Sequence, residues 1–175
     1  MADTPVLETA RLRLRPLASG DEHALFPTLS DPEQCLYLSR PAFESAEELR
    51  GWLADPKWNG RTWIAEDNEG TVVARFVAVP TDDPQAEEVG YITCAERQRQ
   101  GIAREGMVAL IAQLFAENKR RIIAEVDPRN TASVSLLESL GFAREAHLRD
   151  HEVTHIGTCD LYIYALDAPG LPVSA

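Results

Sequence analysis

Hydrophobic residues recur at helical or strand spacing along most of the chain. Between residues 107 and 115, Met, Leu, Ile and Phe return every three or four positions, the pattern of a helix with one buried face. Other segments alternate between apolar and polar residues or are continuously apolar, as strands are: 11–15, 62–66, 71–79, 88–93 and 121–126. The chain is therefore expected to contain both helices and a sheet.

Capping and turn residues indicate where the helices begin and end. Helix starts are expected at 19–22 and at Ser45, because Glu48 lies three residues after Ser45 as in a capping box. Gly141 suits the position just after a helix that ends at Leu140. Further helical segments are expected at about 32–37 and from the 98–103 loop to about 118. Strands are expected at 143–149 and 159–166, with a polar loop at 150–158 between them.

This order of elements predicts an α+β fold with a mixed, mainly antiparallel sheet of about seven strands. The strand–helix–strand unit from 88 to 126 is expected to form a parallel crossover. A chain of 175 residues suits one domain, with a core at about 5–166 and a loose tail at 167–175.

Charge and cysteine usage exclude several classes of partner. The chain has 17 Lys and Arg against 28 Asp and Glu, a formal net charge of −11. This balance disfavours nucleic acid and anionic membranes as partners, and it is compatible with a cationic substrate. Three widely spaced cysteines match neither a disulfide framework nor a zinc site, and His147, His151 and His155 lack a converging ligand set. Without a signal core or a membrane span, a cytoplasmic protein without a metal is expected.

The segment 98–103 connects the strand at 88–93 to the long helix that follows. Gly101 allows a close approach of the backbone to a ligand, and the free N–H groups at the helix start favour a phosphate. A tight turn without a ligand is the alternative. A Walker loop would need Gly-Lys-Ser/Thr, whereas Gly101 is followed by Ile102 and Ala103. A dinucleotide fingerprint would need three spaced glycines, and this loop has one.

The run from Gly90 to Ala103 resembles the acetyl-CoA loop of the GNAT N-acetyltransferases. The signature of that loop is Gln/Arg-x-x-Gly-x-Gly/Ala, which Gln98, Gly101 and Ala103 match. The resemblance extends more loosely from about Pro5 to Leu166. It implies the GNAT fold, in which the central strands splay into a V that holds the pantetheine arm.

Two further features are similar to the RimJ/RimL-type branch of this family. One is the pair Gly90-Tyr91, and the other is Asn130-x-x-Ser133 followed by Gly141-Phe142. The resemblance implies acetyl-CoA as co-substrate, with its pantetheine amides on the free backbone of Ile92 and Thr93. Its pyrophosphate would take backbone N–H groups from the loop: Arg99, Gln100, Gly101, Ile102 and Ala103.

Some of these residues allow two interpretations. Asn130 either contacts the CoA arm or caps the helix that follows it, and one side chain can do both. Arg99 stands where many relatives carry glycine. It is tolerated if its backbone is extended or helical and is strained if its φ angle is positive.

Glu88 is the candidate base that takes a proton from the ammonium through water, because relatives often use a glutamate in this strand; a solvated carboxylate at the strand end is the alternative. Glu87 is its competitor, and strand alternation points the two side chains to opposite faces. Many GNAT enzymes use a tyrosine as the acid, but the matching position here is Leu137. The resemblance to the RimJ/RimL branch implies Ser133 instead, and a plain first-turn serine is the alternative.

The reaction implied is direct attack of a primary amine on the acetyl thioester. A protein or peptide N-terminal amine is the first candidate acceptor; amino acids, polyamines and amino-sugars remain open, as does a non-catalytic acyl-CoA sensor. The chain is expected to act as a monomer or homodimer. The acceptor pocket is expected from the segments least like the family: those around Tyr37, Phe43, Trp52 and Trp58, and 150–158.

Overall fold

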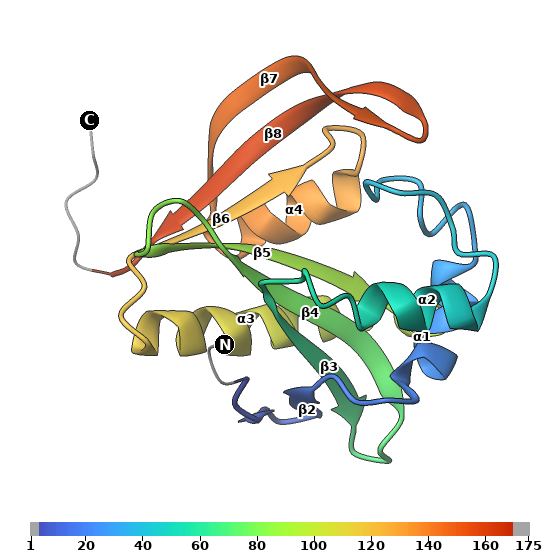
Figure 1. Ribbon diagram of the computed structural model, residues 1–175. Coiled ribbons are helices and arrows are strands. Elements are labelled where there is room, and N and C mark those ends of the chain that lie inside the picture. The colour runs from blue at the N-terminus through green and yellow to red at the C-terminus, as the bar shows by residue number, and fades with distance from the viewer. Residues whose placement is uncertain (1–3, 170–175) are drawn as a thin grey trace.

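The computed structural model describes residues 4–169, so the segments 1–3 and 170–175, including most of the expected tail, lie outside the described residues. One eight-stranded sheet runs through the molecule in the order β1-β2-β3-β4-β5-β6-β8-β7 (Figure 1). The strands are β1 (Leu7–Glu8), β2 (Leu12–Pro16), β3 (Arg61–Asp67), β4 (Val72–Pro80), β5 (Ala86–Thr93), β6 (Arg121–Val126), β7 (Ala143–Thr154) and β8 (Gly157–Asp167). The two-residue β1 adds to the strands expected from the sequence.

The sheet is mixed and mainly antiparallel, as predicted. Within the described residues, β5 and β6 are the only parallel pair, and the other neighbouring strands are antiparallel. The connection between β5 and β6 contains a 3-10 turn, η1 (Ala95–Arg97), and helix α3 (Ile102–Ala116). The remaining helices are α1 (Asp21–Leu29), α2 (Ala46–Leu53) and α4 (Thr131–Ser139).

Two apolar cores lie on opposite faces of the sheet. Trp63 and Ala65 of β3 belong to the core beneath α3 and α4, whereas Ile64 between them packs with α1 and α2. This follows from strand geometry, because successive side chains point to opposite faces. The sheet is thus the middle layer of three, with α1 and α2 on one side and α3 and α4 on the other (Figure 1).

Local chemistry explains where several helices begin and how closely they pack. The Ser45 side chain accepts a hydrogen bond from the Glu48 N–H at 3.1 Å, so the predicted N-cap of α2 is confirmed. Gly106 lets α3 approach β4, since a Cβ at this position would lie 2.2 Å from the Phe76 ring. A glycine inside a helix costs about 1 kcal/mol relative to alanine, and here the close contact requires it.

Two predicted segments differ from the structure. Residues 32–37 form turns rather than a helix. The polar segment 150–158 is mostly strand rather than loop, because β7 continues to Thr154 and β8 begins at Gly157. β7 is the outer strand of the sheet and most of its side chains are exposed, so its polar residues are compatible with strand structure.

Candidate active site

The two parallel strands separate halfway along the sheet and open the site. Their pairing covers Ala86 to Glu88 on β5 and stops where Glu88 lies opposite Ile123. Beyond this point β5 remains paired with β4 through Thr93, while β6 diverges from it (Figure 1). The backbone of β5 from Val89 to Thr93 therefore has a free edge, which can pair with an extended ligand.

The loop 98–103 presents unbonded N–H groups at one end of this opening. Gly101 is the N-cap of α3 with φ +78°, and among the described residues no hydrogen bond uses the N–H groups of 99–103. Arg11 links the loop to helix α3. Its Nη1 donates a hydrogen bond to the Gln100 carbonyl at 3.1 Å, and its Nη2 lies 2.6 Å from Oε2 of Glu105. The loop is therefore preorganised for an anion.

Arg99 adopts the left-handed conformation, with φ +61°. This is the strained one of the two conformations considered for it, and it costs about 1–2 kcal/mol for a residue with a Cβ. Asn118 and Asp150 also have positive φ angles, but they lie outside this loop. The structure thus places a strained arginine directly beside the candidate phosphate seat.

A cavity of about 560 Å³ joins this loop to the free strand edge. We call it the donor cavity. All the residues expected to bind the co-substrate line it except Gln100, whose carbonyl faces Arg11. The lining includes Arg97 and Arg104, which the sequence did not single out, together with Arg99 and Glu33. Arg97 is paired with Asp67 at 2.8 Å. Free N–H groups, a free strand edge and guanidinium groups fit a phosphorylated ligand with an amide-containing arm.

The start of α4 brings two hydroxyl groups together. The Asn130 side chain accepts from the Ser133 N–H at 3.1 Å, so Asn130 is the helix cap. The Ser133 hydroxyl lies 2.7 Å from the Tyr91 hydroxyl of β5. Ser133 is therefore a first-turn residue whose side chain points to β5 and is not used for capping. Leu137 is buried in the core and carries no polar group.

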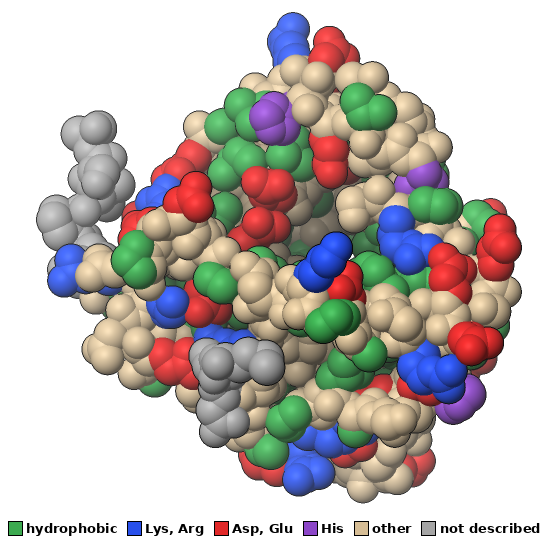
Figure 2. Space-filling view, in the orientation of Figure 1, with side chains coloured by type: hydrophobic (Ala, Val, Ile, Leu, Met, Phe, Trp, Pro, Cys, Tyr) green, Lys and Arg blue, Asp and Glu red, His purple; other side chains and the backbone are tan. Residues whose placement is uncertain are grey.

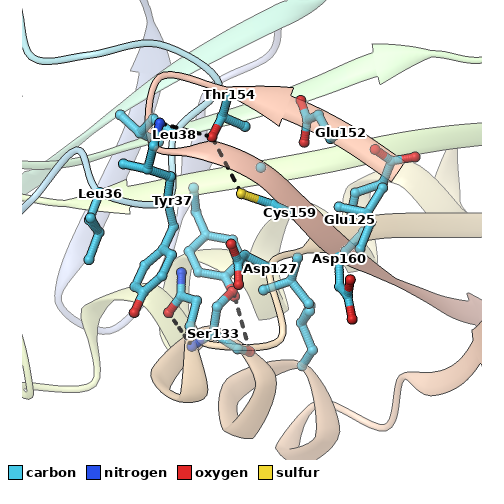
Figure 3. Close-up of a pocket in the computed structure, with 18 of the residues that line it drawn as sticks. Leu36, Tyr37, Leu38, Glu125, Asp127, Ser133, Glu152, Thr154, Cys159 and Asp160 are labelled. Atoms are coloured by element: carbon cyan, nitrogen blue, oxygen red, sulfur yellow. Dashed lines mark hydrogen bonds between the residues drawn. The ribbon is translucent and has the colours of Figure 1, made fainter. Parts of the chain in front are cut away.

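A second cavity, of about 210 Å³, lies between β6, α4 and the β7–β8 hairpin (Figure 3). We call it the acceptor cavity. Four carboxylates line it: Glu125, Asp127, Glu152 and Asp160. Asp127 pairs with Arg129 and Asp160 with His147, whereas Glu125 and Glu152 make no hydrogen bond or ion pair within residues 4–169. Figure 2 shows acidic side chains beside the central hollow of this face.

Glu88 and Glu87 occupy different environments, as alternation predicts. Glu87 is buried and paired with Arg61 at 3.1 Å and Lys119 at 3.0 Å. Glu88 is partly buried, and burial raises its pKa, with repulsion from Glu125 and then Glu152 adding to the effect. Glu88 does not line either cavity, so a proton would reach it through water.

Five residues line both cavities: Tyr37, Leu38, Tyr91, Asn130 and Ser133. This set, which we call the junction, is where groups held in the two cavities can meet. The contact between Tyr91 and Ser133 could not be predicted from the sequence, because it depends on how α4 docks beside the splayed β5. The same holds for Glu125 and Glu152, which come from β6 and β7.

The aromatic residues expected at the acceptor side are only partly there. Tyr37 lines both cavities, and Thr154 and Ile156 line the acceptor cavity. Phe43, Trp52 and Trp58 line neither cavity. Phe43 is buried in the core with α1 and α2, and the rings of Trp52 and Trp58 lie 4.8 and 5.9 Å from the Arg75 guanidinium. Burial lowers the pKa of Arg75 to about 10.

Within residues 4–169, His, Cys, Asp and Glu side chains nowhere gather in a group of three suited to hold a metal ion. His147 and His151 lie on β7, and His155 lies in the turn of the β7–β8 hairpin. Across the same described residues, no helix has both the length and the apolar composition needed to cross a bilayer.

Comparison with known proteins agrees with this geometry. Residues 11–143 match the model of the acetyltransferase (GNAT) domain. The chain belongs to the GNAT acetyltransferase family. The uncharacterised N-acetyltransferase p20 of Bacillus licheniformis is 31% identical over 169 residues, covering 91% of this chain and 94% of p20. The chain is thus an N-acetyltransferase by family, and GNAT acetyltransferases use acetyl-CoA.

Two solved GNAT structures resemble this chain in fold. Spermidine N-acetyltransferase from Vibrio cholerae, in complex with CoA and spermine, has a TM-score of 0.79 at 22% identity, covering 91% of this chain and 96% of that one. RimL, the ribosomal L7/L12 alpha-N-protein acetyltransferase, in complex with CoA, has a TM-score of 0.79 at 19% identity, covering 93% and 98%. The two likenesses are equal in TM-score and do not distinguish a small amine from a protein acceptor.

Proposed function

We propose that this GNAT protein transfers the acetyl group of acetyl-CoA to a primary amine that carries a second positive charge. The observation that carries the proposal is the junction, where a basic donor cavity meets an acidic acceptor cavity. An anionic co-substrate and a cationic acceptor would each lie in the cavity of opposite charge, with their reacting groups adjacent.

In this proposal the CoA pyrophosphate binds the N–H groups of 99–103, with Arg99 and Arg104 beside it. The pantetheine amides pair with the free edge of β5 at Ile92 and Thr93. The Asn130 side-chain amide, whose oxygen caps α4, faces the same cavity. The thioester then lies at the junction, close to Ser133.

The chemistry needs a neutral amine and a stabilised leaving group. Glu88 takes a proton from the ammonium through water, and its raised pKa brings it closer to the working range of a general base. Ser133 faces the departing sulfur and donates its hydroxyl proton. Positioning of the two reactants in adjoining cavities contributes the rest, up to roughly 7–11 kcal/mol in the best intramolecular models.

A polyamine fits the acceptor cavity better than a protein N-terminus does. The cavity is about 210 Å³, and the carboxylates of Glu125 and Glu152 within it are unpaired among the described residues. A second ammonium group would neutralise them, whereas a neutral peptide would leave two carboxylates uncompensated. A protein N-terminal amine, the substrate class of a RimJ/RimL-type enzyme, remains the second candidate on the strength of the Asn130–Ser133 motif and the likeness to RimL.

The test combines donor binding with acceptor turnover. Calorimetric titration should give micromolar affinity for acetyl-CoA and weaker binding of ATP and NAD. Thiol release from acetyl-CoA is then measured with spermidine, with an amino-sugar and with a short peptide lacking charged side chains. We expect the highest kcat/KM with spermidine. A higher value with the peptide would favour the RimJ/RimL-type activity, and binding without amine-dependent release would favour an acyl-CoA sensor.

A further inference from the structure

The hydrogen bond between Tyr91 and Ser133 lies in the junction. The two hydroxyl oxygens are 2.7 Å apart, and both side chains line both cavities. The Tyr91 hydroxyl also lies 3.5 Å from the Ser133 carbonyl, a marginal contact, and makes no other hydrogen bond within the described chain. The tyrosine thus directs its polar group at the serine that the proposed mechanism uses.

Helix stability does not account for this pair. The first turn of α4 is capped by Asn130, which accepts from the Ser133 N–H without involving the Ser133 hydroxyl. The Tyr91 ring already packs against the core beneath α3 and α4. The hydroxyl–hydroxyl contact is therefore additional to both cap and core, and a phenylalanine at position 91 would keep them.

Serine alone is a poor proton donor, because it would have to become an alkoxide. A neighbouring phenol that donates to the serine oxygen removes this difficulty. We infer that Tyr91 is a positioning residue that orients Ser133 toward the CoA sulfur and replenishes its proton. The inference rests on the proposed function, in which Ser133 faces the departing sulfur. Burial raises the pKa of Tyr91, so its hydroxyl holds a proton at neutral pH.

The proton movements balance as follows. The amine nitrogen forms a bond to the acetyl carbon, and the carbon–sulfur bond breaks with its electron pair going to sulfur. The Ser133 hydroxyl gives its proton to sulfur while the Tyr91 hydroxyl gives its proton to the Ser133 oxygen. The nitrogen loses protons as the amide forms, and one of these protons returns to Tyr91 through water. Starting from an ammonium, one net proton is released, and both hydroxyls are restored.

The first experiment is a double-mutant cycle on acetyl transfer. Tyr91→Phe should lower kcat about 10-fold to 100-fold without changing the KM for acetyl-CoA, since general acid catalysis is typically worth that much or more. Ser133→Ala should lower kcat at least as far. In the Ser133→Ala background, Tyr91→Phe should have no further effect, because the tyrosine acts only through the serine.

The matched control is Tyr162→Phe. Tyr162 lies on β8 with its ring 4.8 Å from His147, and it lines neither cavity. Removal of the Tyr162 hydroxyl in this variant should leave kcat at the wild-type value. A Tyr91→Phe enzyme with wild-type kcat, or one whose loss adds fully to that of Ser133→Ala, would overturn the inference.

The second experiment does not need an acceptor. CoA is bound to wild-type and variant protein, and the pKa of its thiol is measured from the ultraviolet absorbance of the thiolate. Hydrogen bonding from Ser133 should lower this pKa in the wild type, and Tyr91→Phe should return it most of the way to the Ser133→Ala value. An equal thiol pKa in wild type and Tyr91→Phe would overturn the inference. A lack of amine-dependent turnover would instead overturn the proposed function, and this titration would still decide the role of Tyr91.

Discussion

The donor and acceptor cavities differ in charge although they share five residues. Three arginines and one carboxylate, Glu33, line the donor side, whereas four carboxylates line the acceptor side. The formal net charge of −11 hides this division, because most of the 28 Asp and Glu residues do not line the acceptor cavity. The distribution of charge about the splayed strands is therefore more informative about the ligands than the total.

The two cavities also differ in how the chain builds them. The phosphate seat of the donor cavity comes from one continuous segment, 98–103, at the start of one helix. The acceptor cavity collects residues from β5, β6, β7, β8, α4 and the segment 36–38. A substitution in the donor loop should consequently have a large local effect, while single changes in the acceptor cavity should be milder.

The largest effect is expected for Gly101→Val. Gly101 has φ +78°, a conformation that strains a β-branched side chain, so valine would shift the loop although its Cβ would meet only Arg11 Nη2, at 3.4 Å. Hydrogen bonds to charged groups are worth about 1.5–3 kcal/mol each. Misalignment of two N–H groups would thus weaken acetyl-CoA binding about 100-fold or more, as measured by calorimetry.

Gly70→Val is the control for backbone strain. Gly70 has φ +79° in the β3–β4 turn, and an added Cβ there would meet nothing within 4 Å. Both variants should lose stability, but only Gly101→Val should lose acetyl-CoA affinity. Unchanged affinity in Gly101→Val would mean that the 98–103 loop is a turn without a ligand.

The different construction of the two cavities also explains how much of the site could be predicted from the sequence. The α+β order, the parallel β5–β6 pair and the donor loop follow from local patterns and from the resemblance carried by Gln98, Gly101 and Ala103. Alternation separated Glu87 from Glu88, and the structure places Glu87 in a buried ion-pair network. Such features depend on residues that are neighbours in sequence.

The acceptor side could not be predicted, because its residues meet only after folding. The first part of β7 was predicted as a strand at 143–149, but its polar continuation lacks a buried face and was therefore predicted as part of a loop at 150–158. Even Val153 in this part of the strand is 81% exposed. Glu125, Glu152 and Tyr91 gain their surroundings from the splay of β5 and β6 and from the docking of α4. Hydrophobic periodicity in the sequence carries no information about the splay of the two strands or about the docking of the helix.

A smaller effect is expected when the acceptor carboxylates are neutralised. Glu125→Gln combined with Glu152→Gln should raise the KM for spermidine about 10-fold, since each unpaired carboxylate contributes about 0.7 kcal/mol to binding a cation. The KM for acetyl-CoA should not change. Glu69→Gln, in the exposed β3–β4 turn, is the control and should leave both values unchanged. If the KM for spermidine were the same in the double variant as in the wild type, these carboxylates would not take part in acceptor binding.

The pH dependence of kcat/KM should be sensitive to the same two carboxylates, because they raise the pKa of Glu88. Burial, then Glu125 and Glu152, raise the pKa of Glu88, and a base must be ionised to act. The acidic limb of kcat/KM should therefore lie at higher pH than an ordinary glutamate would give. Glu152→Gln removes one like charge, lowers the pKa of Glu88 and should move this limb to lower pH. A limb that does not move in Glu152→Gln would assign the titration to another group.

The smallest effect is expected at Arg99, where strain and charge can be separated. Arg99→Gly removes the strain of φ +61°, about 1–2 kcal/mol, and adds the chain entropy of glycine, about 0.5–1 kcal/mol. The fold should therefore gain about 0.5–1 kcal/mol in free energy of unfolding, which raises Tm by about 2 °C. Arg99→Ala keeps the strain and removes only the guanidinium. If the arginine contacts a CoA phosphate, both variants should bind acetyl-CoA several-fold more weakly at low salt, and the difference should shrink at high salt. Equal melting temperatures for the two variants would show that the positive φ angle carries no strain, and unchanged affinity in both would show that the donor cavity does not use this charge.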